Sequence, residues 1–172
     1  MKQFNFLSKS LFSIIMLAIV VGAIAVPVAA AAPPAQAERD YTGLKYALKW
    51  LVLRADLQQD HLDHAQAGAD LAAEFIAEEQ AAGFDTSELE AALADFRASL
   101  TEAQGFHDTA AQILAEKAGF DSEGNVVDPR QARDTLKDAG RALQDSHQTL
   151  RIAGQDFRQA MRDYRQSKHN ES

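Results

Sequence analysis

Apolar residues recur with a helical period along three long stretches of the chain. Within each stretch the spacing alternates between four and three residues, which is the heptad pattern of helices that pack side by side. The apolar positions of the first stretch are Leu44, Leu48, Leu51, Ala55, Leu62, Ala65, Ala69, Ala72 and Ile76. Those of the second are Leu89, Leu93, Phe96, Leu100, Ala103, Ala110 and Leu114. Those of the third are Ala132, Leu136, Ala139, Leu143, Leu150, Ala153, Phe157, Ala160 and Tyr164. The pattern predicts an all-α protein with long, alanine-rich helices.

Glycine and capping residues mark the ends of these helices. Gly83 and Gly119 follow the first two stretches, and glycine readily takes the left-handed conformation that ends a helix. Asp128 precedes Pro129, so a capping carboxylate and a proline in the first turn begin the third helix. The predicted helices span about residues 41–82, 86–118 and 129–166.

The links between the helices decide the topology. Residues 83–85 are too few for anything but a tight reversal, so the first two helices must be antiparallel neighbours. The second link is longer but still local, and it favours an up-down-up antiparallel three-helix bundle. Matching positions across this link places Ser146 about six residues, or roughly 9 Å, from the level of His107.

The first 37 residues have the pattern of a secretory signal. Lys2 and Lys9 precede an apolar run from Leu11 to Val26, and Ala35-Gln36-Ala37 matches a cleavage site. We therefore expect a hydrophobic N-terminal signal helix, a single bundle domain over residues 38–172, and export to the periplasm, cell surface or exterior. Alternatively, the segment stays uncleaved as an anchor, which would be the only membrane contact expected.

Composition excludes several classes of function. The chain has no cysteine, which rules out disulfides, thiolate metal sites and thiol nucleophiles. Its formal charge is −8, and loss of the two signal lysines would leave 15 basic and 25 acidic residues, or −10. Nucleic acid and anionic membranes are therefore poor partners. The charge is −5 over residues 38–84, −8 over 85–128 and +3 over 129–172, which suggests that the third helix complements the other two.

A second apolar stripe on the first helix is the main candidate for function. Tyr46, Trp50, Leu53 and Leu57 are again spaced by four, three and four residues, and they lie opposite the heptad stripe. A three-helix bundle would leave them in water, and an exposed apolar patch usually marks a binding surface for another protein or a second copy. The alternative is that the second link folds over the stripe with its apolar residues Phe120, Val126 and Val127.

Histidines and aspartates form a candidate metal site. His61 and His64 are three residues apart and so share a face of the first helix, and His107 lies at a matching level of the second. Asp60 or Asp63, next to them in sequence, could add a carboxylate ligand. Imidazole and carboxylate groups could hold Zn or Cu. We expect no cofactor other than this possible metal. The alternative is that His61 and His64 are solvated and that His107 is a core histidine.

Three polar residues interrupt the heptad stripes. They are Gln58, His107 and Ser146, one on each helix. A buried polar residue can specify which helices pair and in which register. Catalysis would instead need a nucleophile and a base in contact, and no such pair is evident. We therefore expect a non-enzymatic protein.

One short motif carries a family resemblance. Leu100-Thr101-Glu102-Ala103-Gln104 resembles the L-T-x-x-Q motif of small periplasmic helical proteins, the Spy-like chaperones and envelope-stress regulators. The chain is also similar to exported, alanine-rich helical-bundle proteins of bacteria. These resemblances imply an extracytoplasmic protein that binds other proteins or clients. Residue pattern and resemblance together favour a protein-binding function, with a metal-binding envelope protein or a Spy-like chaperone as alternatives.

Overall fold

A computed structural model describes the backbone of residues 41–171 and the side chains of residues 41–169. This part of the chain is helical, with α1 (Thr42–Ala81), α2 (Ser87–Glu116) and α3 (Pro129–Glu171), and it contains no strand. The predicted signal helix, residues 1–37, lies outside the described residues. Of the three helices, none has a stretch apolar and long enough to span a membrane.

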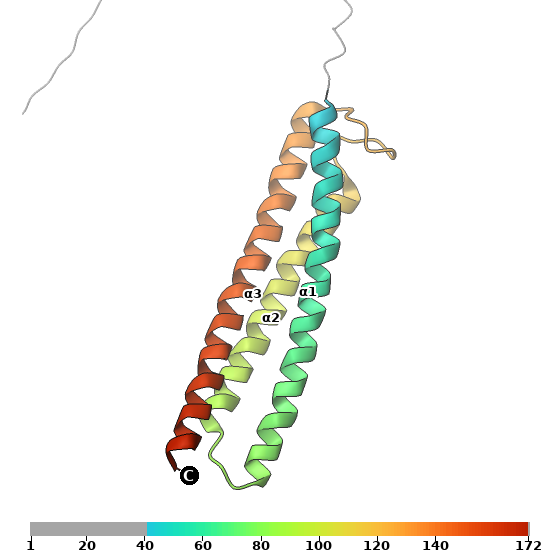
Figure 1. Cartoon of the computed structure of the whole chain (residues 1–172). Coiled ribbons are helices and arrows are strands. Elements are labelled where there is room, and N and C mark those ends of the chain that lie inside the picture. The colour runs from blue at the N-terminus through green and yellow to red at the C-terminus, as the bar shows by residue number, and fades with distance from the viewer. Residues whose placement is uncertain (1–40, 172) are drawn as a thin grey trace, which may run out of the picture. The chain divides into compact units, whose positions relative to one another are not determined.

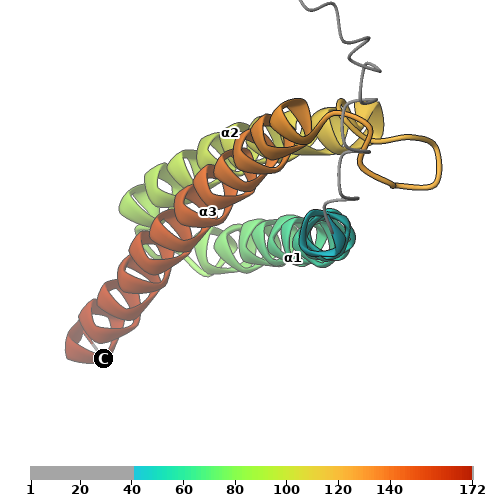
Figure 2. The same ribbon diagram turned by 90° about the horizontal axis from the view of Figure 1, so that it is seen from above.

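The three helices alternate in direction: in Figure 1, α1 runs downward, α2 upward and α3 downward. At one end, Lys45 Nζ on α1 donates to Asn125 Oδ1 in the second link, at 2.6 Å. At the other end, the Tyr164 hydroxyl on α3 donates to Glu79 Oε2 on α1, at 2.7 Å. These contacts make α1 and α3 parallel, with α2 antiparallel to both. Figure 2 shows α1 on one side of the α2–α3 pair.

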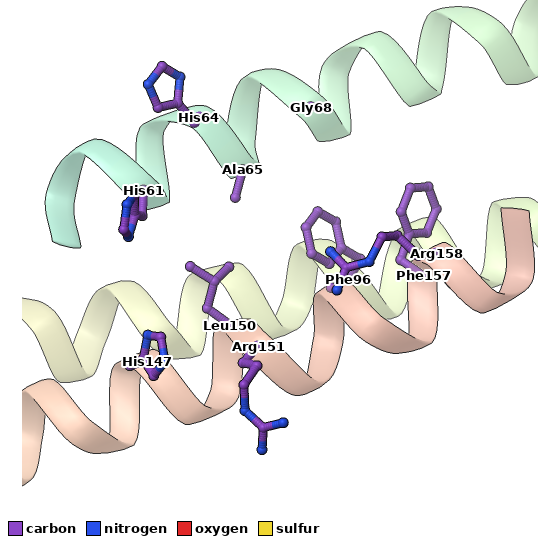
Figure 3. A pocket seen from close by; sticks show the side chains of 11 residues that line it. His61, His64, Ala65, Gly68, Phe96, His147, Leu150, Arg151, Phe157 and Arg158 are labelled. Carbon is purple, nitrogen blue, oxygen red and sulfur yellow. The ribbon is translucent and has the colours of Figure 1, made fainter. Parts of the chain in front are cut away.

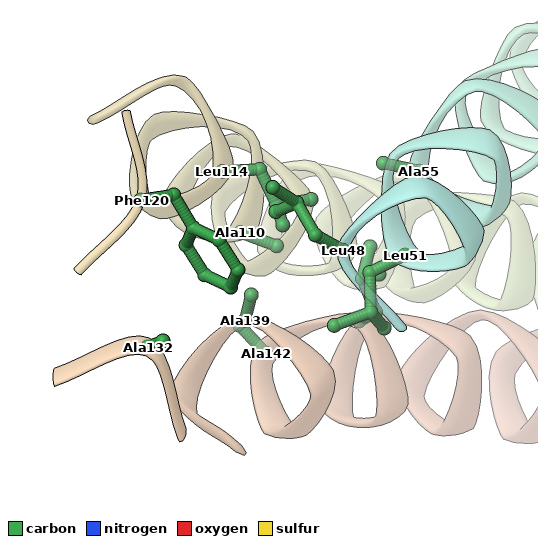
Figure 4. Close-up of a cluster of buried hydrophobic side chains, with 10 residues drawn as sticks. Leu48, Leu51, Ala55, Ala110, Leu114, Phe120, Ala132, Ala139 and Ala142 are labelled. Atoms are coloured by element: carbon green, nitrogen blue, oxygen red, sulfur yellow. The ribbon is translucent and has the colours of Figure 1, made fainter. Parts of the chain in front are cut away.

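The interior consists of two hydrophobic clusters. The first lies near the second link, is drawn in Figure 4, and comprises Leu48, Leu51, Ala55, Ala110, Leu114, Phe120, Ala132, Ala139, Ala142 and Leu143. The second lies toward the α1–α2 turn and comprises Leu62, Ala69, Ala72, Ile76, Leu89, Leu93, Phe96, Leu100, Ala103 and Ala153. Both clusters are built within the described residues, so this part of the chain contains its own core.

A polar layer separates the two clusters. It consists of Gln58, His107 and Ser146, all buried. His107 Nε2 donates to the Ala55 carbonyl oxygen, 3.0 Å away, and so joins α2 to α1. Gln58 Nε2, His107 Nδ1 and Ser146 Oγ have no hydrogen-bond partner among the described residues. Asp108 Oδ1 lies 3.7 Å from His107 Nδ1, which is too far for a hydrogen bond.

The predicted level of α3 was wrong. Ser146 occupies the same layer as His107, because each of them fills the gap between the two clusters on its own helix. Two contacts fix this register: Phe96 stacks on Phe157 with ring centroids 5.3 Å apart, and Thr135 Oγ1 donates to the Ala118 carbonyl at 2.8 Å. The first turns of α3 therefore pack beside the non-helical residues that follow α2.

The turns after Gly83 and Gly119 look alike in sequence but differ in structure. Both glycines have positive φ angles, +87° and +84°. A Cβ on Gly83 would meet nothing within 4 Å, whereas a Cβ on Gly119 would lie 2.2 Å from the Ala132 backbone nitrogen. The residue after Gly119, Phe120, is buried in the first cluster. Only glycine lets the second link pack this closely against α3.

Aspartate carboxylates bind free backbone N–H groups at the starts of α2 and α3, and the one before α3 is a helix cap. Asp128 Oδ1 accepts from the backbone N–H groups of Arg130 and Gln131, which confirms the predicted cap of α3. Before α2, Asp85 Oδ1 accepts from the Ser87 N–H at 3.0 Å. These carboxylates satisfy donors that have no partner inside the helix.

Candidate binding surface on the first helix

Helix α1 has two apolar faces, which we name the inner stripe and the outer stripe. The inner stripe (Leu44, Leu48, Leu51 and Ala55) packs in the first core cluster. The outer stripe consists of the four predicted partner-binding residues. Their exposed fractions are 66% for Tyr46, 57% for Trp50, 57% for Leu53 and 53% for Leu57. Val52 beside them is 41% exposed, so the outer stripe is a continuous apolar surface in contact with water.

The second link packs on the inner stripe. Phe120 is buried with Leu48 and Leu51 in the first cluster (Figure 4), and Val126 packs against the same cluster. Val127 is 66% exposed. The link projects beside the start of α1 (Figure 1). Its apolar side chains, however, face the core or the solvent. These three residues therefore do not cover the outer stripe.

Basic side chains flank the outer stripe. Lys45, Lys49 and Arg54 lie between residues 44 and 57, where Asp56 is the one acidic residue. The guanidinium carbon of Arg54 lies 5.3 Å from the centroid of the Trp50 ring, within the range of a cation–π contact. The surface thus combines aromatic and aliphatic groups with local positive charge, although the chain as a whole is acidic.

The structure does not bring the predicted metal ligands together. His61 and His64 are exposed on α1, while His107 is buried and turns toward the Ala55 carbonyl. Asp63 accepts a hydrogen bond from Gln59 at 2.8 Å. Over residues 41–171, no group of three histidine, aspartate or glutamate side chains is placed to hold a metal ion. The cause is the heptad position of His107, which points into the core and away from the solvent face of α1.

His147 also belongs to this region, although its place there was not predicted from the sequence. His147 lies on α3 and lines a hollow together with His61 and His64 (Figure 3). The excess positive charge of residues 129–172 was the one signal in the sequence that basic groups gather on α3. The wrong level assigned to α3 prevented their placement beside His61.

The L-T-x-x-Q residues lie in the middle of α2. Leu100 is buried in the second cluster. The Thr101 hydroxyl donates to the Arg97 carbonyl at 3.1 Å, one turn earlier in the same helix. Gln104 Nε2 donates to Gln59 Oε1 on α1 at 3.0 Å. In this chain the motif therefore packs α2 against the other helices and joins it to α1.

Among the described residues, three carboxyl groups have a lowered pKa, and all three lie at turns or helix ends. Hydrogen bonds from Lys168 and then Tyr164 lower the pKa of Glu79. The backbone N–H of Ser87 lowers the pKa of Asp85. Hydrogen bonds from Asn125 lower the pKa of Asp121 in the second link. Each shift favours the charged carboxylate and so stabilises a turn or a helix contact.

Comparisons of the chain with family models, with curated proteins and with solved structures give no match.

Proposed function

We propose that this chain is an exported, non-enzymatic helical-bundle protein that binds another protein, or a second copy of itself, through the outer stripe. The observation that carries the proposal is the exposure of Tyr46, Trp50, Leu53 and Leu57 in one row on a helix whose other face is fully packed. Water-exposed apolar rows of this kind usually mark protein interfaces. The secretory pattern of residues 1–37 supports export.

The composition of the outer stripe suits protein binding. Tryptophan and tyrosine are enriched among the residues that dominate interface energies. Leu53 and Leu57 extend the same surface by two helical turns. A fitting partner presents an apolar groove or helix face with acidic groups at its rim, which would meet Lys49 and Arg54. The acidic surface of a second copy satisfies the charge requirement.

The test combines two substitutions in the outer stripe. Trp50→Glu with Leu53→Glu places two charges at the centre of the surface, where an interface would have to bury them. We expect wild-type protein to associate in sedimentation velocity, or to retain a specific envelope protein in a pull-down, and the double variant to lose both. Circular dichroism should show unchanged helicity, because neither side chain packs in the core.

Leu71→Glu provides the matched control. Leu71 is on the same helix and is 66% exposed, but it does not belong to the outer stripe. This variant should associate like the wild type. The proposal is wrong if the double variant unfolds, if it associates as well as the Leu71→Glu control, or if the wild type stays monomeric and captures nothing specific.

A chaperone activity would be one form of the same function. The L-T-x-x-Q resemblance supports it, and the outer stripe would then contact unfolded clients instead of one folded partner. In that case wild-type protein slows the aggregation of a denatured model client, and the Trp50→Glu, Leu53→Glu variant does not. Protection by both proteins would exclude the outer stripe as the client surface.

A further inference from the structure

A hollow of about 550 Å³ lies between α1 and α3 (Figure 3). Its apolar surface comes from Ala65 on α1, Phe96 on α2, and Leu150 and Phe157 on α3. Phe96 and Phe157 stack with ring planes 15° apart, which gives this surface a flat aromatic part. The volume lies within the range of about 300–1,000 Å³ that is typical of small-molecule sites.

The polar groups around this hollow are all basic or imidazole groups. They are His61, His64, His147, Arg151 and Arg158, and no aspartate or glutamate lines it. Two other hollows on the bundle differ in this respect, because Asp85, Glu88 and Asp163 line one and Asp63 and Asp108 line the other. In an acidic chain, a concave surface without carboxylates selects for negative charge.

Arg158 is placed to meet such a charge. Its Nη1 atom lies 3.3 Å from the position that a Cβ on Gly154 would occupy, so the guanidinium folds back over a residue without a side chain. It lines the hollow together with Phe96 and Phe157 (Figure 3). Among the described residues, Arg158 has no carboxylate partner. At that end of the bundle, Lys168 is the residue that pairs with Glu79.

We infer that this hollow binds an amphipathic organic anion of the long-chain carboxylate class. The hydrocarbon chain lies on Phe96, Leu150 and Phe157, and the carboxylate receives two parallel hydrogen bonds from the Arg158 guanidinium. His61 and His147, which point into the space between α1 and α3 in Figure 3, add N–H donors at the rim. The site is separate from the outer stripe, so the inference does not depend on the proposed function.

Isothermal titration of residues 38–172 with dodecanoate, below its micelle concentration, tests the site. The matched probe is dodecyltrimethylammonium, which has the same hydrocarbon chain and the opposite charge. We expect saturable one-to-one binding of dodecanoate and binding of the cation that is weaker by about tenfold or more. Nonspecific attraction would give the reverse order, because the chain is acidic. Absence of saturable dodecanoate binding, or preference for the cation, would overturn the inference.

Three variants locate the binding. Arg158→Gln should weaken dodecanoate binding by about fivefold, since it removes one exposed charge–charge contact. Arg141→Gln removes an exposed charge from the same helix outside the hollow and should change nothing. Gly68→Leu places a side chain in the hollow where a Cβ meets no atom within 4 Å, and it should abolish binding while the helices remain folded.

The outer stripe supplies the remaining control, because it is also apolar and exposed. The Trp50→Glu, Leu53→Glu variant should bind dodecanoate like the wild type. The inference is wrong if this variant loses binding while Arg158→Gln and Gly68→Leu retain it, since the anion would then lie on the outer stripe. It is also wrong if Arg158→Gln and Arg141→Gln weaken binding equally.

Discussion

The inner and outer stripes of α1 have the same spacing and similar residues, yet only one of them is buried. Leu48 and Leu51 are 5% and 6% exposed, whereas Trp50 and Leu53 are each 57% exposed. Phe120 and the small residues of α2 and α3 cover the inner stripe, and no described residue of comparable size covers the outer one. Both faces are apolar and have the same period. The difference therefore shows that burial on this helix depends on which side chains the neighbouring helices and the second link place against each face.

The largest expected difference between the two stripes is the loss of stability when one leucine of each is truncated. Leu51→Ala removes a core side chain and should lower the free energy of unfolding by about 3 kcal/mol. Leu53→Ala, two residues away, should change it by less than about 0.5 kcal/mol, because the side chain is already in water. Urea denaturation followed by circular dichroism measures both. Equal losses would mean that the outer stripe belongs to the core.

The turn at Gly119 offers a second way to disturb the inner stripe alone. Gly119→Ala forces a Cβ into the Ala132 backbone and should displace Phe120 from the first cluster. Gly83→Ala is the control, since its positive φ costs about 1–2 kcal/mol without any clash. We expect Gly119→Ala to cost about 1–2 kcal/mol more than the control. Melting curves of equal midpoint would contradict the close packing of the second link on α3.

The heptad pattern predicted the core of this bundle closely. Every buried residue of α2 belongs to the predicted stripe, and the same holds for α1. The level of α3 was not predictable, because it depends on how residues 117–128 fold: Gly119 packs on Ala132, and Phe120 forms an isolated bridge with Val126. This error hid the neighbourhood of His61 and His147. The pattern also did not show that Lys168, and none of the arginines of α3, would form the ion pair with α1 among the described residues.

The polar layer lies between the two core clusters. A substitution in this layer should change the free energy of unfolding by a smaller amount. Ser146 is fully buried, and its hydroxyl has no hydrogen-bond partner among the described residues. Ser146→Ala should therefore raise the free energy of unfolding by about 1 kcal/mol, since a buried hydroxyl without a partner is costly. Chemical denaturation of this variant beside the wild type measures the change. A loss of stability would show that the hydroxyl makes a hydrogen bond that stabilises the layer.

The smallest expected effect is a change in stability at low pH, which depends on Asp121 in the second link. Hydrogen bonds from Asn125 hold the pKa of Asp121 below its unfolded value of about 3.9. The stabilisation is therefore complete above that pH and is lost as the pH falls through the folded value. Asp121→Asn should lower stability at pH 7 and flatten the acid side of the stability–pH curve between about pH 4 and pH 2. An unchanged acid slope would show that Asp121 does not contribute to it.

Trp50 is the chain's single tryptophan and lies at the centre of the outer stripe, so its fluorescence tests the central claim most directly. In the dilute monomer we predict that the Trp50 emission maximum is red-shifted, as for an exposed indole, and that acrylamide quenches it readily. As protein concentration rises, or when a captured partner is added, the emission should shift to the blue and quenching should fall in step with the association seen by sedimentation. A blue-shifted emission maximum with weak quenching, in protein that sedimentation shows to be monomeric, would contradict the account. A maximum that stays red-shifted and easily quenched in the complex would also contradict it.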